Sequence, residues 1–283
     1  MAARPRTLPA AVAPVLVGTA LAVLDDEFRA LAFVAALLGA ILIQVGTNLS
    51  NDYSDARRGA DTEDRLGPVR VTAGGLVPPR QVLIATYVTF ALAVLVGLYL
   101  VYVAGPELLL VGAASILAGV LYTGGPRPYG YEGLGEVFVF TFFGIVAVTG
   151  SYYVHAEELP WEAFVLAVPV GLLAAAILVV NNVRDLETDR RAGKRTLAVR
   201  LGRGRTRGLY AGMLALAYAV LAALVASLSA WVLLPLLSVP LALRLVRTVR
   251  THADGPTLNQ ALAQTGMLQL VFCLLLSAGI LLS

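Results

Sequence analysis

The sequence is poor in charge, in histidine and in cysteine. Only 14% of its 283 residues are charged and 58% are hydrophobic, whereas a soluble domain usually carries about 25% charged residues. This composition excludes an ordinary water-soluble fold. The single cysteine, Cys273, excludes an intramolecular disulfide. With only two histidines beside it, the chain also has too few ligands for a zinc site or an array of haems.

What the sequence has in abundance is long apolar runs. Because backbone groups in lipid must be satisfied within the span, runs of this length predict helices. We therefore expect an all-α, polytopic membrane protein that forms a single domain over residues 1–283. The N-terminal segment has the appearance of a signal peptide, but its three prolines and the many spans after it favour a first membrane helix. Nine spans are predicted, at residues 8–24, 30–51, 80–103, 107–123, 134–154, 161–181, 207–226, 229–246 and 260–282.

The basic residues gather in alternate loops. With the N-terminus inside, all 21 Lys and Arg residues except Arg29 fall on the cytoplasmic side, while the outer loops carry acidic residues. This asymmetry follows the positive-inside rule and supports the count of nine spans. It predicts a multi-pass protein of the cell (inner) membrane with its C-terminus outside. It also explains the net charge of +3 by topology, so we expect membrane lipid rather than nucleic acid as a partner.

Two inner loops begin with clusters of asparagines and aspartates. Asn48, Asp52 and Asp55 are spaced so that a helix places them along one face, with Asn51 beside them and Asp61 further on. The second cluster has the same kind of spacing and consists of Asn181, Asp185 and Asp189. If the two helices face each other, amides and carboxylates converge on a common point.

Aspartate is disfavoured at a helix C-terminus, which is the negative end of the helix dipole. The alternative, that these are merely hydrated helix ends, leaves that cost without compensation, whereas a cation would neutralise it. Carboxylate and amide oxygens suit Mg²⁺, which commonly binds one or two carboxylates together with substrate phosphates. Basic residues follow both clusters, as a metal-bound diphosphate requires: Arg65, Arg70, Arg190, Arg191, Lys194 and Arg195. Lys194 is the only lysine in the chain, which favours a functional role for it.

Other motifs narrow the function. The glycine pairs at 74–75 and 124–125 are not followed by the Lys-Ser/Thr of a P-loop, so nucleotide hydrolysis has no support. Aromatic residues crowd the inner ends of the fourth and fifth spans. They could pack and form an interfacial belt, or their rings could stabilise a carbocation. They are Tyr122, Tyr129, Tyr131, Phe138, Phe140, Phe142 and Phe143.

These motifs together resemble the UbiA superfamily of intramembrane prenyltransferases over nearly the whole chain. The stretches that carry the resemblance are RPRTLP at 4–9, NDYSD at 51–55, DRLGPVR at 64–70, YTGGP at 122–126, GLGE at 133–136, NNVRD at 181–185 and DRRAGKRTLAVRLG at 189–202. Within them, DRLGP at 64–68 and GKRTL at 193–197 are similar more narrowly to the branch that prenylates 1,4-dihydroxy-2-naphthoate.

The resemblance implies nine helices around a central cavity with a cytoplasmic cap, and Mg²⁺ as cofactor. It implies transfer of a polyprenyl group from a prenyl diphosphate to 1,4-dihydroxy-2-naphthoate, with decarboxylation, giving demethylmenaquinone. The expected catalytic residues are Asp55, Asp185 and Lys194. The expected metal ligands are Asp52, Asp55, Asp61, Asp185 and Asp189. The residues expected to bind the diphosphate or the acceptor are Asn48, Asn51, Arg65, Arg70, Tyr122, Asn181, Arg190, Lys194 and Arg195.

The first motif departs from the general superfamily pattern, because Gly59 stands where the last aspartate is usual and Asp61 follows two residues later. This leaves open whether Asp61 binds metal directly or through water. A different acceptor, 4-hydroxybenzoate or a lipid, is an alternative. A transporter is a further one, since acids in membrane helices also mark ion paths. Prenyl chain length and oligomeric state are open at this stage.

Overall fold

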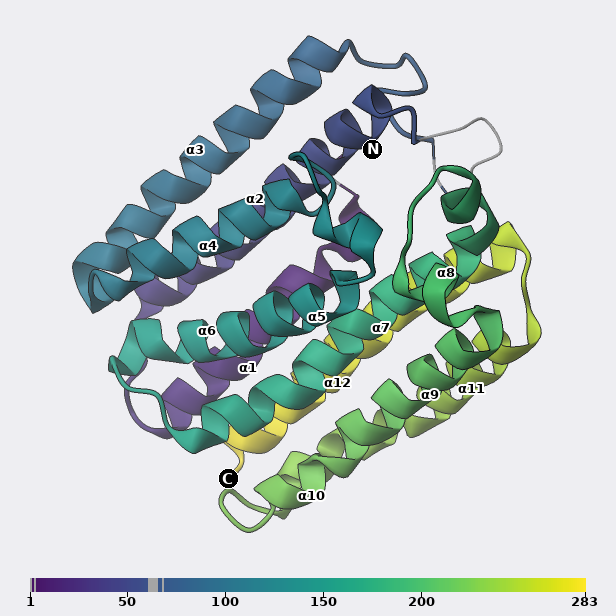
Figure 1. The fold of residues 1–283 in the computed structure, drawn as a ribbon. Helices are drawn as coiled ribbons and strands as arrows, with labels where there is room; N and C mark the ends of the chain where they lie inside the picture. Colours follow the sequence, from purple (N-terminus) through teal and green to yellow (C-terminus); the bar gives the residue numbers. More distant parts are fainter. Residues whose placement is uncertain (1, 3, 61–65, 68) are drawn as a thin grey trace.

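The computed structural model describes residues 2, 4–60, 66–67 and 69–283, and all its regular elements within these ranges are helices. The helices lie side by side in a bundle (Figure 1). Seven are long and apolar enough to cross a membrane, and two further apolar helices are shorter, α1 (Pro9–Leu24) and α4 (Glu107–Leu121). Each predicted span coincides with one of these helices, so the all-α polytopic fold is confirmed.

Four of the seven long spans are single α-helices: α2 (Ala30–Arg57), α3 (Pro79–Ala104), α7 (Trp161–Arg191) and α12 (Gly255–Leu281). The other three are compound, and the components of the first are α5 (Gly135–Phe140), the π-helical η3 (Thr141–Val146) and α6 (Ala147–Ala156). The other two consist of α9 (Arg203–Ala219) with α10 (Leu221–Leu224), and of the 3₁₀-helix η4 (Ala230–Ser238) with α11 (Val239–Thr251). Pro235 lies within η4, where it removes a backbone donor and accounts for the departure from the predicted regular helix.

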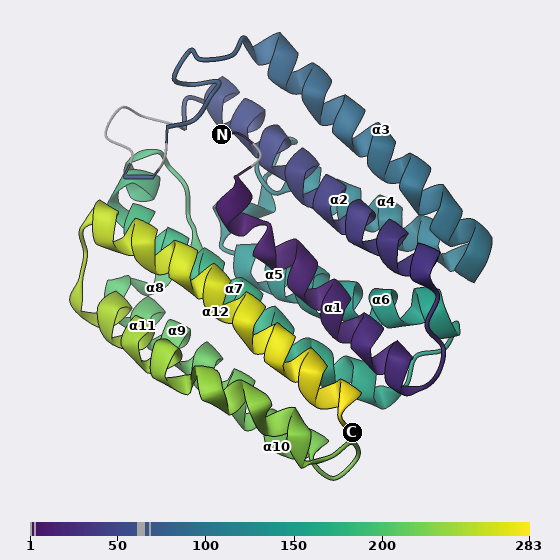
Figure 2. The same cartoon turned by 180° about the vertical axis from the view of Figure 1, so that it is seen from behind.

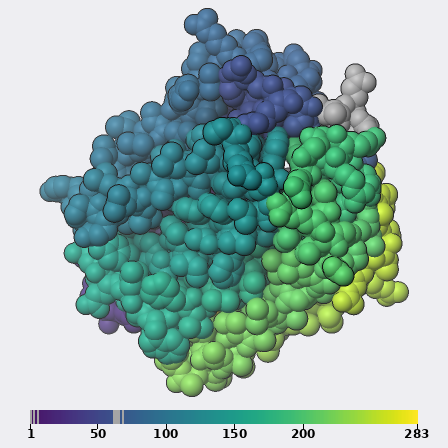
Figure 3. Space-filling view, in the orientation of Figure 1, coloured from purple at the N-terminus to yellow at the C-terminus, as the bar shows by residue number. Residues whose placement is uncertain are grey.

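Three short elements complete the described chain, and all lie in or beside the loops at one end of the bundle. They are η1 (Pro5–Thr7), η2 (Tyr129–Glu132) and α8 (Leu197–Leu201). The loop that holds η2 lies directly against the segment that follows α7 (Figure 3), and the Arg195 backbone N–H donates to the Tyr131 carbonyl over 2.8 Å. These loops cap the end of the bundle that carries both aspartate clusters.

Helix α7 is the centre of the packed core. Its residues from 163 to 186 are mostly buried, and it packs against α1, α9 and α12 (Figure 2). Large apolar side chains such as Leu173 and Phe272 fill this core, and Cys273 is buried in it as the apolar run around it predicts. Helices α2, α3 and α4 lie on the opposite side of α1 and α6 from α9 and α11 (Figure 1).

Helices α2 and α7 continue beyond the apolar spans, to Arg57 and Arg191. The predicted spans end at residues 51 and 181, because hydropathy falls where the polar clusters begin. A helix satisfies its own backbone hydrogen bonds, however, and can extend beyond the apolar segment. The described aspartates of both clusters therefore lie on helices, as their spacing predicts.

Candidate active site

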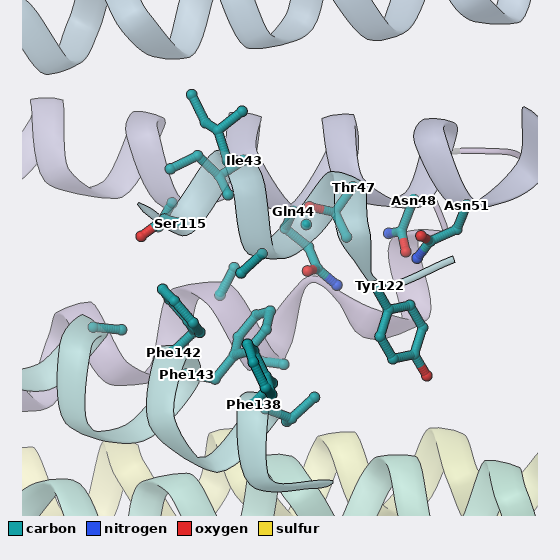
Figure 4. A pocket seen from close by; sticks show the side chains of 18 of the residues that line it. Ile43, Gln44, Thr47, Asn48, Asn51, Ser115, Tyr122, Phe138, Phe142 and Phe143 are labelled. Atoms are coloured by element: carbon teal, nitrogen blue, oxygen red, sulfur yellow. The ribbon is translucent and has the colours of Figure 1, made fainter. Parts of the chain in front are cut away.

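A cavity of about 580 Å³ is lined by residues of α2, α3 and α4 on one side and of α1, α5, α6 and α7 on the other. One end is lined by polar side chains from α2 and from the C-terminal part of α7. The other end is apolar and extends toward the opposite ends of α3 and α4. Figure 4 shows this change along α2, where Asn48 and Asn51 lie toward Tyr122, and Ile43 lies toward Ser115 and Phe142. A single cavity therefore offers a polar mouth and an apolar interior.

At the polar end, Asp55 is held by side chains from three different segments, two through hydrogen bonds and one through an ion pair. The Arg70 guanidinium donates to its Oδ2 over 2.9 Å, and the Tyr131 hydroxyl donates to its Oδ1 over 2.6 Å. The Lys194 ammonium lies 3.6 Å from the same Oδ1. Asp55 is 1% exposed, and an ionised carboxylate at this burial requires partners of this kind. Two cations from different segments therefore lie against this carboxylate beside the cavity.

Asp52 holds the loop that delivers Arg70. Its two carboxylate oxygens accept from the backbone N–H groups of Val71 and Thr72, at 3.2 and 2.9 Å. Both oxygens therefore face the loop, and Asp52 is not among the residues that line the cavity. The adjacent Arg70 is thereby positioned over Asp55, one turn further along α2.

The element η2 brings Tyr131 between the two helix ends. Gly130 lies so close to Tyr122 that a Cβ there would come within 2.6 Å of the Tyr122 carbonyl oxygen. The turn after α7 passes through Gly193 at φ +74°, a conformation that favours glycine. Lys194 follows, and its ammonium lies 4.7 Å from the centroid of the Tyr131 ring. Lys194, in the turn after α7, therefore places its ammonium beside the Asp55 carboxylate on α2.

On α7, Asp185 is held by its neighbour in the sequence. The Arg184 guanidinium donates to both carboxylate oxygens of Asp185, with Nε at 2.8 Å from Oδ1. The same guanidinium donates to Asn181 Oδ1 over 2.9 Å and to Asn259 Oδ1, on α12, over 2.6 Å. Arg184 is 2% exposed, so four oxygens from three other residues surround a fully buried cation.

The wall nearest the N-terminus adds neutral donors and one more cation. The Thr7 hydroxyl, in η1, accepts hydrogen bonds from Gln44 Nε2 at 3.1 Å and Asn48 Nδ2 at 3.3 Å. These three residues and Arg4 all line the cavity. Arg4 has a positive φ of 48°, a conformation uncommon for a residue with a side chain. The N-terminal segment therefore forms part of the site instead of lying apart from it.

Aromatic rings form the wall opposite α2. The Tyr129 and Phe138 rings stack with centroids 3.9 Å apart, and the Phe138 and Phe142 centroids are 6.1 Å apart. Tyr122 packs edge-on against Tyr129 at 5.5 Å. Burial raises the pKa of the Tyr129 hydroxyl, which therefore keeps its proton and donates to the Ala118 carbonyl over 2.8 Å. These rings present π-faces and edges between the polar mouth and the apolar interior.

Most of the residues expected from the sequence meet in this cavity. Those that line it are Asn48, Asn51, Asp55, Arg70, Tyr122, Asn181, Asp185, Asp189 and Lys194. Arg190 and Arg195 are exposed, and the Arg190 guanidinium pairs with Glu187 at the surface. Asp52, expected as a metal ligand, does not line the cavity and accepts from Val71 and Thr72 instead. Asp61 and Arg65 lie outside the described residues.

The lining residues that the sequence did not assign to the site include Arg4, Thr7, Gln44 and Tyr131. A signal for Gln44 was present, because it lies one turn before Asn48 and so continues the polar face of α2 into the apolar span. Arg4 and Thr7 belong to a stretch that only the family resemblance marked. Tyr131 was assigned to the aromatic cluster, and nothing in its local sequence indicates a hydrogen bond to a carboxylate 76 residues away.

The fold and the cavity define the class: a polytopic membrane protein with a buried, charged mouth on an apolar chamber. The chain belongs to the UbiA prenyltransferase family, whose model matches residues 11–269.

The chain is similar over its full length to proteins of that family. It is 45% identical to a 1,4-dihydroxy-2-naphthoate octaprenyltransferase from Mycobacterium tuberculosis, with 98% of this chain and 94% of the relative covered. It is 41% identical to the enzyme of the same name from Escherichia coli, with 99% and 94% covered. Its fold is similar to that of a UbiA homolog from Archaeoglobus fulgidus bound to DMAPP and Mg²⁺. That match has a TM-score of 0.70 and 16% identity, and covers 98% of this chain and 97% of the homolog.

Proposed function

We propose that this protein transfers a polyprenyl group from a prenyl diphosphate to 1,4-dihydroxy-2-naphthoate. The observation that carries the proposal is the pairing of two buried aspartate-bearing helix ends with cations at the mouth of an apolar cavity. Full-length similarity to naphthoate octaprenyltransferases supports the choice of acceptor and donor. The diphosphate would occupy the polar mouth, and its isoprenoid chain would extend into the apolar interior.

The oxygen donors at the mouth fit Mg²⁺. Among the described residues, no group of three or more His, Cys, Asp or Glu side chains could hold a metal ion by itself. Mg²⁺ rarely needs such a cage, since it binds through one or two carboxylates and completes its shell with water and substrate phosphates. We expect Asp55, Asp185 and Asp189 to hold it together with the diphosphate. When bound, Mg²⁺ would supply positive charge that neutralises the diphosphate.

The residues of the chain then have separable tasks. Arg70 and Lys194, which now neutralise Asp55, would bind diphosphate oxygens and stabilise the charge that develops as the diphosphate leaves. Arg184 would hold Asp185 in one orientation. The rings of Tyr122, Phe138 and Phe142 would stabilise positive charge on the allylic carbon through their π-faces. The enclosing helices would keep water from the cation.

The chemistry balances without an oxidant. The C–O bond of the prenyl diphosphate breaks, and the diphosphate leaves with the electron pair. A ring carbon of the naphthoate forms the new C–C bond to the allylic carbon. The same ring carbon then loses its carboxylate as CO₂, which returns an electron pair to the ring and restores its aromaticity. The product is a prenylated hydroquinone, demethylmenaquinol, which is the reduced form of demethylmenaquinone.

The test is product identification by mass spectrometry with purified protein, the naphthoate, a polyprenyl diphosphate and Mg²⁺. We expect prenylated, decarboxylated naphthohydroquinone or its quinone. EDTA should abolish turnover, and excess Mg²⁺ should restore it. Equal or faster transfer to 4-hydroxybenzoate in direct competition would overturn the acceptor assignment. Undiminished turnover in EDTA would overturn the metal requirement.

We also infer that the polar mouth faces the cytoplasm, with the N-terminus inside and the C-terminus outside. The distribution of arginine supports this orientation. An Arg190→Cys variant offers a test, because Arg190 is exposed at the polar end and the one native cysteine is buried. A membrane-impermeant maleimide should label it in inverted membrane vesicles. Labelling in intact cells instead would reverse the orientation.

A further inference from the structure

Four glycines that line the apolar part of the cavity have no close neighbours. They come from four different helices: Gly39 from α2, Gly97 from α3, Gly112 from α4 and Gly150 from α6. A Cβ at Gly97, Gly112 or Gly150 would meet no heavy atom within 4 Å. A Cβ at Gly39 would meet only Val96 Cγ1, at an ordinary contact distance of 3.9 Å.

Several other helical glycines of the chain are explained by packing. A Cβ at Gly119 would come within 2.2 Å of Thr47 Oγ1, and one at Gly18 within 2.3 Å of the Val148 carbonyl oxygen. Glycines at such positions let membrane helices approach closely. The four cavity glycines allow no such approach, although glycine in a helix costs roughly 1 kcal/mol relative to alanine. What distinguishes these four from the open glycines on α9, such as Gly212, is that they line the cavity.

Three of the four lie at one level of the bundle. Gly39 is in contact range of Val96, the residue before Gly97, so α2 and α3 bring these two glycines together. Gly119 packs on Thr47, and α2 and α4 run in the same direction (Figure 1). Gly112 lies about two turns before Gly119 on α4, and Ala40 lies about two turns before Thr47 on α2. Gly112 is therefore at the level of Ala40, which follows Gly39 and also lines the cavity.

Gly150 lies within about one turn of this level. Val154, one turn after it, packs with Ala32 on α2 and Ala104 on α3. Gly150 therefore lies nearer to the polar mouth than that cluster, at about the level of Ala36, another lining residue. The level is deep: at 1.5 Å per residue, Gly39 and Asp55 are about 24 Å apart along the axis of α2.

We propose that Gly39, Gly97, Gly112 and Gly150 form a glycine collar that sets how long a prenyl chain the cavity accepts. This inference rests on the proposed function and extends it to the choice of donor. A dimethylallyl or geranyl group with its diphosphate beside Asp55 ends before the collar, whereas a long polyprenyl chain must pass through it. A leucine side chain at any collar position would project into that passage. It would therefore obstruct long donors and leave short donors unaffected.

The experiment compares Gly97→Leu and Gly112→Leu with the wild type over a series of donors. The series runs from dimethylallyl and geranyl through farnesyl to long polyprenyl diphosphates, with one acceptor throughout. The leucine side chain would take up space that a long prenyl chain needs, as in an overpacked core, so kcat/KM for the long donors should fall about tenfold or more. For dimethylallyl and geranyl diphosphate it should stay within about twofold of wild type, which also shows that the variant is folded.

Gly212→Leu is the matched control. Gly212 lies on α9, a Cβ there would also meet no heavy atom within 4 Å, and it does not line the cavity. Its donor profile should equal that of the wild type. Gly97→Ala, a smaller change that favours helix formation, should shift the profile in the same direction by less.

The outcomes distinguish a failure of the collar proposal from a failure of the proposed prenyl transfer. An unchanged dependence on chain length in the leucine and alanine variants would overturn the collar, and so would an equal loss with donors of every length. A wild-type protein that transfers no prenyl group from any donor would instead overturn the proposed function. A length-dependent loss in Gly212→Leu would also count against the collar, because it would show that the effect does not need the cavity.

Discussion

The ends of α2 and α7 each present a buried aspartate to the same cavity, but they hold it in different ways. Asp55 on α2 is bound by Arg70, Tyr131 and Lys194, which come from three other segments of the chain. Asp185 on α7 is bound by Arg184, the residue before it, and Arg184 is anchored by Asn181 and Asn259. One carboxylate depends on the assembled cap, and the other is oriented largely by its own helix.

The difference indicates a division of labour. The cations around Asp55 lie on loops and turns, where they can move from the carboxylate to a diphosphate. The cation at Asp185 is fully buried and surrounded by acceptors, so its role is to fix a geometry. We expect the α2 end to be sensitive to changes far along the sequence, and the α7 end to be sensitive mainly to changes within α7 and α12.

The largest effect is expected from Asp55→Asn and Asp185→Asn. Each removes a carboxylate at the position of the proposed metal–diphosphate complex, so turnover should fall by about 10²–10³-fold or more. The comparison is sharpened by thermal unfolding in detergent. Asp55→Asn removes the carboxylate that Arg70 and Lys194 share, whereas Asp185→Asn leaves Arg184 two amide acceptors. A larger loss of thermal stability in Asp185→Asn than in Asp55→Asn would refute the comparison.

Arg184→Gln should have the next largest effect. It removes one partner of a buried ion pair, which typically costs about 3–5 kcal/mol, and it frees Asp185 to rotate. The unfolding temperature and kcat should both fall, and Arg184→Lys should recover only part of each because an ammonium cannot bind both oxygens in parallel. Arg200→Gln is the control, since its pair with Glu132 is partly exposed and worth under about 1 kcal/mol. Equal loss in both variants would show that burial is not decisive.

Lys194→Gln tests the cation that follows α7 and pairs with Asp55 on α2. Hydrogen bonds to charged groups contribute about 1.5–3 kcal/mol, so kcat/KM for the prenyl diphosphate should fall about thirtyfold. Arg190→Gln should change it by less than about twofold, because Arg190 is exposed and pairs with Glu187. Steady-state kinetics with varied diphosphate measure both, and a larger effect at Arg190 would contradict the site described above.

Tyr131→Phe should give the smallest effect of the series. It removes the 2.6 Å hydrogen bond to Asp55 and keeps the ring over Lys194. A loss of about 1.5 kcal/mol, or roughly tenfold in kcat/KM, is expected at the lower end of the range for a hydrogen bond to a charged group. Tyr129→Phe, which loses only a bond to the Ala118 carbonyl, should lower thermal stability slightly and leave kcat/KM unchanged. The reverse pattern would make Tyr129 the functional residue.

Much of the fold could be predicted because a membrane imposes simple rules. Apolar length identifies the spans, and the i, i+4 spacing of Asn181, Asp185 and Asp189 is enough to align them on one helix face. Local rules were insufficient at Asp52. Its spacing equally suits the cavity face, yet both its oxygens face Val71 and Thr72, and only the path of a loop 19 residues away decides this.

The same reason explains why the sequence could not distinguish the exposed basic residues from the one that reaches the site. Arg190, Lys194 and Arg195 follow one another closely, and only the turn at Gly193 determines that Lys194 points back to Asp55. The glycine collar is a similar case, because glycines that permit packing and glycines that widen a cavity are identical in sequence. The distances from Gly119 and Gly97 to their neighbours are what separate the two kinds.

By itself, the sequence determined that this chain crosses a membrane several times and carries two aspartate clusters on helix ends, because hydropathy and helical periodicity depend only on local order. The tertiary structure alone decided which cation serves which carboxylate and where the cavity widens. Those features depend on contacts between segments that lie far apart in the chain, and such contacts exist only once the helices have packed.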